Sequence, residues 1–245
     1  MPINHDTITT ADGTCRVTVA TPDGDGPWPG VVMYPDAGGV RATFDQMAAQ
    51  LAGYGYVVLV PDVYYREAGW APFDMGSVFG DEDERKRLFG MIAKVTPEIM
   101  ATDAAAFFDY LQARPDVRGD TFGTTGYCMG GRISLIVAGR VPDRVAAAMS
   151  FHGGGLAADD PGSPHLLAEQ ITARVYVGGA RDDASFTVAD SLILEAALTA
   201  AGVDHTIEFY SAAHGFAVPD NLPYDEAAAR QHWEAMAQVF GSTLR

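Results

Sequence analysis

Gly126-Tyr127-Cys128-Met129-Gly130-Gly131 is the stretch that decides the fold. A cysteine stands between glycines in a Gly-x-Cys-x-Gly pattern, the form of a nucleophile elbow, in which serine is the commoner central residue. Such an elbow turns sharply from a strand into a helix, and its flanking residues must be glycine because side chains there would meet neighbouring backbone. The surrounding sequence fits, since residues 122–127 predict a strand and residues 129–139 a helix. A buried cysteine in a tight turn would give the same short pattern. The residues expected to act together with Cys128 therefore decide between these two interpretations.

Two adjacent carboxylates are candidates for the acid that orients the base. The strand predicted at residues 174–178 leads to Asp182 and Asp183, and an acid just past a strand end can hold a catalytic histidine. Asp183 is favoured because residues 184–186, Ala-Ser-Phe, resemble the turn that commonly follows this acid. Asp182 fits a solvated loop residue, and the choice between the two stays open.

His214 is the expected base. It follows the strand predicted at residues 206–210 and precedes Gly215, which completes the chain order nucleophile, acid, histidine. The alternative is a histidine in a surface loop. His152, after the strand predicted at residues 145–151, precedes the acid and is therefore interpreted as a wall of the substrate pocket.

The chemistry expected of these residues is covalent catalysis by a thiol. Cys128 would lie at a helix N-terminus, whose partial positive charge stabilises a thiolate and a developing oxyanion. The backbone N–H of Met129 would be one oxyanion donor. The thiolate would attack an ester or lactone carbonyl, and water would then hydrolyse the thioester while His214 moves the proton.

The order of predicted elements gives the fold class. Strands are predicted at residues 14–20, 30–34, 56–60, 122–127, 145–151, 174–178 and 206–210, and helices at residues 44–54, 99–113, 129–139, 188–201 and 224–240. Alternating strands and helices predict an α/β protein with a mostly parallel central sheet between two helix layers. With the elbow, this predicts the three-layer α/β-hydrolase fold. No repeat or linker divides the chain, so residues 1–245 are expected to form one domain.

Residues 62–96 fit the alternation poorly. Aromatic residues come first in this segment, and a charged run from Asp81 to Arg87 follows. Long segments beside an α/β sheet are often functional, so we expect a lid. An excursion that packs on the outside of the sheet is the alternative.

Composition excludes several classes of protein. The formal net charge of −16 and the pI near 4.5 argue against nucleic-acid and membrane-surface partners. The first residues do not form a signal peptide, and no apolar run is long enough to cross a bilayer. Cys15 and Cys128 are the only cysteines, which excludes a disulfide scaffold and a cysteine-rich zinc site and favours the cytoplasm.

Nearly the whole chain resembles the dienelactone hydrolase family (carboxymethylenebutenolidases). The resembling segments are residues 34–39 (Tyr-Pro-Asp-Ala-Gly-Gly), 61–66 (Pro-Asp-Val-Tyr-Tyr-Arg), 126–131, 179–183 and 214–216 (His-Gly-Phe). The resemblance implies a triad of Cys128, His214 and Asp183 and no cofactor or metal. It also implies that Asp36 pairs with the resting thiol and that the N–H of Ala37 is the second oxyanion donor. Asp36 is one methylene shorter than the glutamate of family members that cleave dienelactone, and it also fits a turn residue.

The substrate pocket is expected to be aromatic and without a free cation. Its predicted lining is Tyr64, Tyr65, Arg66, Trp70, Phe79 and His152. Family members that cleave dienelactone have an arginine shortly after the catalytic histidine, and residues 215–219 contain none. We therefore expect a neutral small-molecule ester or lactone as substrate, and a monomer or small homo-oligomer.

Two other functions fit the sequence. The same triad could serve a thioesterase or an acyltransferase, and product analysis with alcohol or thiol acceptors would distinguish these from a hydrolase. A catalytically silent hydrolase fold could instead act as a binding protein. The intact set of three residues in the right order argues against this second alternative.

Overall fold

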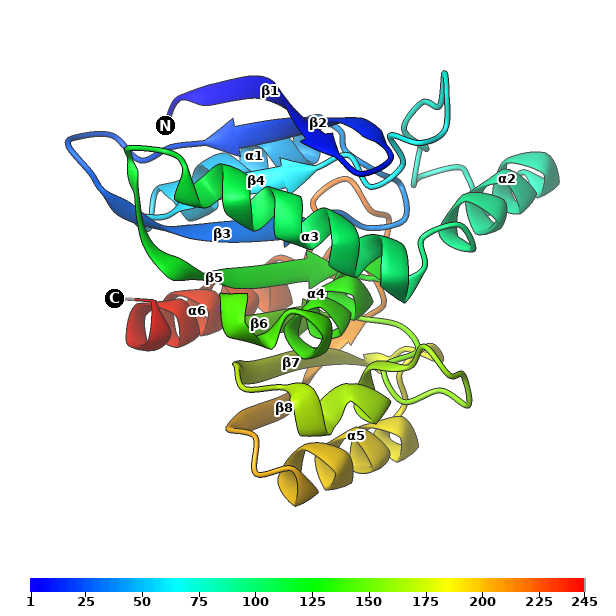
Figure 1. Cartoon of the computed structure of the whole chain (residues 1–245). Helices are drawn as coiled ribbons and strands as arrows, with labels where there is room; N and C mark the ends of the chain where they lie inside the picture. Colours follow the sequence, from blue (N-terminus) through cyan, green and yellow to red (C-terminus); the bar gives the residue numbers. More distant parts are fainter. Residues whose placement is uncertain (245) are drawn as a thin grey trace.

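The strands form one eight-stranded sheet in the order β1-β2-β4-β3-β5-β6-β7-β8 (Figure 1). The computed structural model describes residues 1–244. The strands are β1 (Ile3–Thr10), β2 (Gly13–Ala20), β3 (Trp28–Tyr34), β4 (Val57–Pro61), β5 (Val117–Tyr127), β6 (Val145–Phe151), β7 (Arg174–Asp182) and β8 (His205–Ala213). Strand β2 pairs antiparallel with β1 and β4, and all the other neighbours are parallel. The mostly parallel sheet predicted from the sequence is confirmed.

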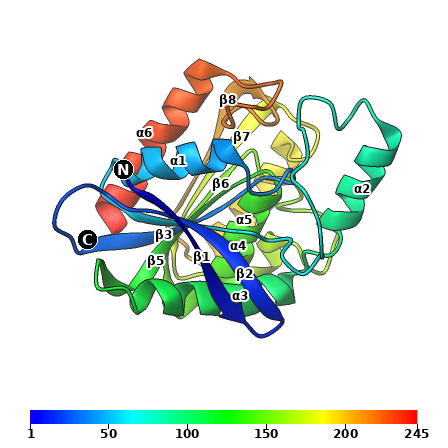
Figure 2. The ribbon, with the colours of Figure 1, turned by 90° about the horizontal axis from the view of Figure 1, so that it is seen from above.

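Helices cover both faces of this sheet. They are α1 (Ala42–Ala52), α2 (Glu82–Ile92), α3 (Pro97–Gln112), α4 (Met129–Arg140), α5 (Val188–Ala200) and α6 (Glu226–Thr243), with short 3₁₀ turns at Pro142–Arg144 and Pro164–Gln170. Side chains of α1 and α6 pack in one apolar cluster, and those of α3, α4 and α5 pack in another on the opposite face. Figure 2 shows these two layers of helices on either side of the sheet.

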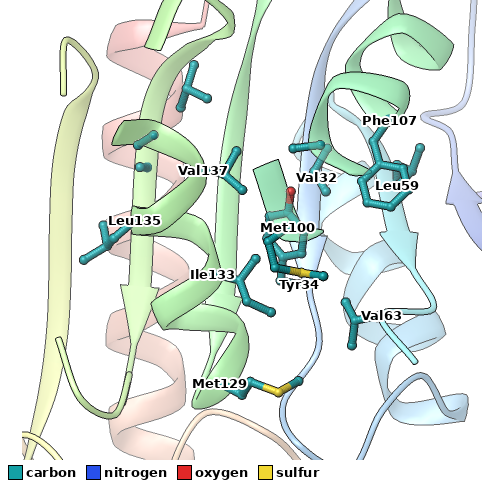
Figure 3. Close-up of a cluster of buried hydrophobic side chains, with 14 of the residues drawn as sticks. Val32, Tyr34, Leu59, Val63, Met100, Phe107, Met129, Ile133, Leu135 and Val137 are labelled. Carbon is teal, nitrogen blue, oxygen red and sulfur yellow. The ribbon is translucent and has the colours of Figure 1, made fainter. Parts of the chain in front are cut away.

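The apolar cluster under α3 and α4 holds the carboxyl ends of β3 and β5 against α4. Val32 and Leu59 come from neighbouring strands, and Ile133 and Val137 come from α4; all four are buried. Figure 3 shows their side chains facing one another, with Met129 at the first turn of α4. Because apolar contacts fix α4 against β3 and β5, its N-terminus stays above the ends of these strands.

Strand β1 and helix α2 differ from the sequence prediction. Strand β1 was not predicted, because its first five residues are exposed and give no alternating apolar pattern. It forms by pairing with β2 in an antiparallel register from Ile3 and Ala20 to Thr10 and Gly13.

The charged run of residues 81–87 contributes most of helix α2. The Asp81 carboxylate caps this helix by accepting hydrogen bonds from the N–H groups of Asp83 and Glu84. Only Leu88 and Met91 of the helix are buried, so it stands out from the body of the protein (Figures 1 and 2). Movement of residues 62–96 as a lid stays a prediction.

Candidate active site

The elbow at Cys128 has the strained backbone that the glycine pattern predicts. Cys128 adopts φ 54° and ψ −116° between the end of β5 and the start of α4. Residues other than glycine rarely adopt this backbone conformation. Its N–H donates a hydrogen bond of 3.1 Å to the carbonyl oxygen of Phe151 in β6. The turn therefore holds residue 128 at the carboxyl edge of the sheet.

The glycines of the elbow are required by close backbone approaches. A Cβ atom at Gly126 would lie 2.0 Å from the carbonyl oxygen of Gly130, and one at Gly130 would lie 2.3 Å from that of Tyr34. Both neighbours are backbone atoms that cannot rotate away. These two positions therefore have no room for a side chain.

Gly126→Ala is expected to lower the free energy of unfolding by about 3 kcal/mol or more, or to prevent folding, because overpacking against backbone cannot relax locally. Gly90→Ala in α2 is the matched control, since a Cβ at Gly90 meets no atom within 4 Å. It should raise the free energy of unfolding by roughly 0.5–1 kcal/mol through helix propensity. Urea denaturation measures both, and equal small effects would show that the elbow tolerates a side chain.

Asp183 and His214 meet where β7 and β8 end. The Nδ1 atom of His214 lies 2.7 Å from Oδ2 of Asp183, which is almost completely buried. The other oxygen, Oδ1, accepts hydrogen bonds from the backbone N–H (2.8 Å) and the hydroxyl (2.6 Å) of Ser185. Asp182 is instead the exposed last residue of β7. Of the two carboxylates that the sequence left open, the structure brings Asp183 to the histidine.

Neighbouring groups raise the pKa of His214 above its usual range. Burial disfavours the charged imidazolium, but the charge of the Cys128 thiolate and the hydrogen bond to Asp183 outweigh burial and raise the pKa of His214 to about 10. Burial also raises the pKa of Asp183, but hydrogen bonds from His214 and Ser185 outweigh it and leave the pKa below its ordinary value. The surroundings therefore favour a charged His214 imidazolium backed by an ionised Asp183 carboxylate.

The Tyr64 hydroxyl contacts both residues whose N–H groups are the expected oxyanion donors. This hydroxyl donates to the carbonyl oxygen of Ala37 at 2.9 Å and lies 3.4 Å from the sulfur of Met129. Met129 is the first residue of α4, so its N–H has no acceptor within the helix. Tyr64 is buried and thereby joins the loop after β3 to the first turn of α4.

His152 is a buried neighbour of the base. Its ring lies 5.2 Å from the ring of His214 and 5.1 Å from that of Phe216. Within residues 1–244, neither ring nitrogen has a hydrogen-bond partner. Burial, and then the charge of His214, lower the pKa of His152 well below its usual range, so its ring is neutral. Its backbone is also strained, with φ 39°, which the sequence did not indicate.

Asp36 is bound by a residue that the sequence analysis missed. Arg41 holds both carboxylate oxygens, with Nη1 2.7 Å from Oδ1 and Nη2 2.9 Å from Oδ2. The carboxylate also accepts hydrogen bonds from the Gly38 N–H and from the Asn221 side chain. The structure thus gives Asp36 a different partner from the thiol that the resemblance implies.

The remaining pocket candidates lie in three different surroundings. Trp70 packs edge-on against Tyr64, with ring centroids 5.2 Å apart. The side chains of Tyr65 and Arg66 instead bind Asp103. Phe79 is 56% exposed. Trp70 therefore packs on the tyrosine that binds Ala37, whereas Tyr65 and Arg66 bind a buried carboxylate of α3.

Two further properties concern residues 1–244: they contain no metal-binding cluster, and their other thiol, that of Cys15, is buried. No group of three or more His, Cys, Asp or Glu side chains among residues 1–244 could hold a metal ion. Cys15 is buried in β2, and burial raises the pKa of its thiol far above the ordinary value. None of the helices within the same residues combines the length and the apolar character needed to cross a membrane.

Known proteins resemble this chain in sequence and in structure. The model of the dienelactone hydrolase family matches residues 15–244. A "Putative carboxymethylenebutenolidase" of Synechocystis sp. is 29% identical over 238 residues, covering 93% of this chain and 91% of the relative. A protein of the same name from Escherichia coli K12 is 26% identical over 223 residues, covering 88% of this chain and 78% of the relative.

Solved structures share the fold over almost their full length. A "Putative Dienelactone Hydrolase" from Klebsiella pneumoniae superposes with a TM-score of 0.85 at 24% identity, covering 98% of both chains. A dienelactone hydrolase-like promiscuous phosphotriesterase from metagenomic libraries gives 0.80 at 24% identity, covering 100% of both. These structures establish the α/β-hydrolase fold, and the family model covers nearly all of the sequence. The chain therefore belongs to the dienelactone hydrolase family and is a hydrolase of that type.

Proposed function

We propose that this hydrolase cleaves a small neutral ester or lactone through a Cys128 nucleophile and a thioester intermediate. The observation that carries the proposal is the Asp183–His214 hydrogen bond beside a cysteine at the strained start of α4. A helix N-terminus and a charged imidazolium both favour the thiolate, which is the reactive form of cysteine. The three residues follow strands β5, β7 and β8, whose carboxyl ends lie at one edge of the sheet.

Each residue has a defined task in this mechanism. The Cys128 thiolate attacks the carbonyl carbon, and the N–H groups of Met129 and Ala37 bind the resulting oxyanion. His214 gives its proton to the leaving alcohol and later takes one from the water that attacks the thioester. Asp183 holds the imidazole in one tautomer and stabilises its charged form.

Trapping the acyl enzyme tests the proposal. Purified protein is mixed with an activated aryl ester, quenched in acid within one turnover and digested for mass spectrometry. The acyl group should be found on the peptide that contains Cys128, and the Cys15 peptide should be unmodified. Release of the alcohol without any acylated Cys128 would remove the thioester mechanism. Transfer of the acyl group to an added alcohol or thiol in preference to water would favour an acyltransferase.

The upper pH limit of activity should report on Asp183. The His214 imidazolium keeps its proton up to a pH of about 10, so kcat/KM for an aryl ester should decline only near that pH. Asp183→Asn removes a charge and a hydrogen bond that raise this pKa, so the decline should move to lower pH. Asp182→Asn changes an exposed residue and should leave the profile unchanged. Profiles between pH 6 and 11 that are identical for the two variants would leave the acid unassigned.

A further inference from the structure

Arg41 is the most heavily bonded cation beside the proposed site. Its guanidinium makes paired hydrogen bonds to both oxygens of Asp36 (2.7 and 2.9 Å) and to both oxygens of Asp220 (2.7 and 2.7 Å). It also donates to the carbonyl oxygen of Gly39 at 3.0 Å. The side chain of Arg41 is 11% exposed, and that of Asp36 is 1% exposed. Such bidentate pairs fix both partners in orientation as well as in charge.

These contacts join the two loops that carry the proposed catalytic groups. Asp36 directly precedes Ala37, the expected oxyanion donor, in the loop after β3. Asp220 and Asn221 belong to the loop after β8, which begins with His214. The Asn221 side chain also lies close to Gly215, the residue after His214. A Cβ atom at Gly215 would be 3.2 Å from the amide nitrogen of Asn221. One arginine therefore sets the position of one loop relative to the other.

The same contacts neutralise a buried charge close to the nucleophile. The Tyr64 hydroxyl donates to the carbonyl oxygen of Ala37, next to Asp36, and lies 3.4 Å from the sulfur of Met129, next to Cys128. Burial raises the pKa of Tyr64, and the charges of Cys128 and Asp36 raise it further, so both groups act on one hydroxyl. An unpaired carboxylate here would repel a thiolate, since like charges disfavour each other in a dry site.

We propose that Arg41 is a positioning residue with two effects: it neutralises Asp36 so that the Cys128 thiolate can form, and it ties the Ala37 loop to the His214 loop. The proposal rests on the function proposed above, because it takes Cys128 as the nucleophile. Asp36 is then part of the scaffold of the site and is unavailable as a partner of the resting thiol.

Arg41→Met tests both effects, because methionine keeps much of the length of the side chain and removes the charge. The rate of Cys128 alkylation by iodoacetamide is measured against pH, with the label located by peptide mapping. The pH midpoint of alkylation should rise by roughly one unit, since Asp36 loses its cation. With an activated aryl ester, kcat should fall roughly 10- to 100-fold and KM should change less, because the oxyanion donor is displaced.

Three further variants separate charge from position. In Asp36→Asn/Arg41→Met the midpoint should return close to that of the wild type, while kcat stays low because the loops are still untied. Arg41→Lys should keep the midpoint and recover only part of kcat, since an ammonium cannot form two bidentate pairs. Arg16→Met is the matched control: it removes an arginine that pairs with Asp62 through a mostly exposed side chain, and it should change neither quantity.

A folded Arg41→Met variant with an unchanged midpoint or an unchanged kcat would overturn the proposal. If Arg41→Met does not fold, the double variant Asp36→Asn/Arg41→Met replaces it, because this variant contains no unpaired buried charge. A wild-type kcat of the double variant would contradict the positioning role of Arg41. The alkylation profile needs no substrate. A protein that cleaves no ester but shows the expected shift in midpoint would therefore contradict the proposed function while supporting the charge effect of Arg41.

Discussion

His214→Ala is expected to lower kcat/KM for an aryl ester by roughly 10⁴-fold or more, because the base, the proton donor and the counter-ion of the thiolate are lost together. His152→Ala should cost far less, on the order of tenfold. Its ring is neutral and contacts His214 edge-on at 5.2 Å, so it shapes the site without moving protons. Steady-state kinetics of the two purified variants make the comparison.

The triad should also behave as a unit. Cys128→Ala and the double variant with His214→Ala should be about equally inactive, since a nucleophile without its base gains little from either residue alone. Circular dichroism and urea denaturation confirm that each variant is folded. An inactive His152→Ala beside a nearly wild-type His214→Ala would exchange the roles of the two histidines.

The second large effect concerns the charge of the substrate. We expect kcat/KM for a neutral aryl ester to exceed that for dienelactone by roughly 10²–10³-fold. Dienelactone carries a free carboxylate, and a desolvated anion that lacks its charge-assisted partner loses about 2–5 kcal/mol of binding. A factor of ten corresponds to about 1.4 kcal/mol, so this loss spans orders of magnitude in rate.

Two arginines that could have received such a carboxylate, Arg41 and Arg66, are already bound by aspartates. Arg66 is bound by Asp103 and Asp12, and Arg41 is bound by Asp36 and Asp220. Residues 215–219, which directly follow the proposed base His214, contain no basic side chain. Arg41 and Arg66 are thus neutralised by the protein itself.

A matched pair of substrates isolates this effect. Dienelactone and its methyl ester share the lactone and differ in the charge of the side group, so their ratio of kcat/KM reports the charge alone. Lactone opening is followed in both cases, separately from methyl ester cleavage. A preference for the free acid would contradict the prediction and point to an unpaired cation such as Arg85 on α2.

Local patterns predicted the fold and the contact between Asp183 and His214. The glycines around Cys128 form a short local pattern, so the elbow could be predicted directly from the sequence, although the backbone that excludes a side chain at Gly130 is that of the distant Tyr34. His214 and Asp183 could be proposed because each follows a predicted strand, and parallel strands bring their carboxyl ends to one edge. The core of the sheet was predictable for the same reason, since short buried strands leave continuous apolar runs.

Long-range contacts account for what the sequence did not reveal. Arg41 binds Asp220, which lies 179 residues away, and no local pattern encodes such a pair. Tyr65 and Arg66 were predicted to line the pocket because aromatic and basic residues gather there. Their side chains turn toward Asp103 on α3 instead, because a buried carboxylate requires partners. Strand β1 depends on its register with β2 rather than on its own apolar residues.

The strained backbone at Cys128 has a consequence for how this protein could change under selection. A non-glycine residue at φ 54° carries about 1–3 kcal/mol of conformational strain, and glycine at the same position would relieve most of it. A screen for heat resistance alone should therefore enrich glycine at residue 128, and with it lose the nucleophile. Cysteine is retained only if catalytic activity is selected together with thermal stability. The proposed activity requires the cysteine side chain, whereas stability favours its removal.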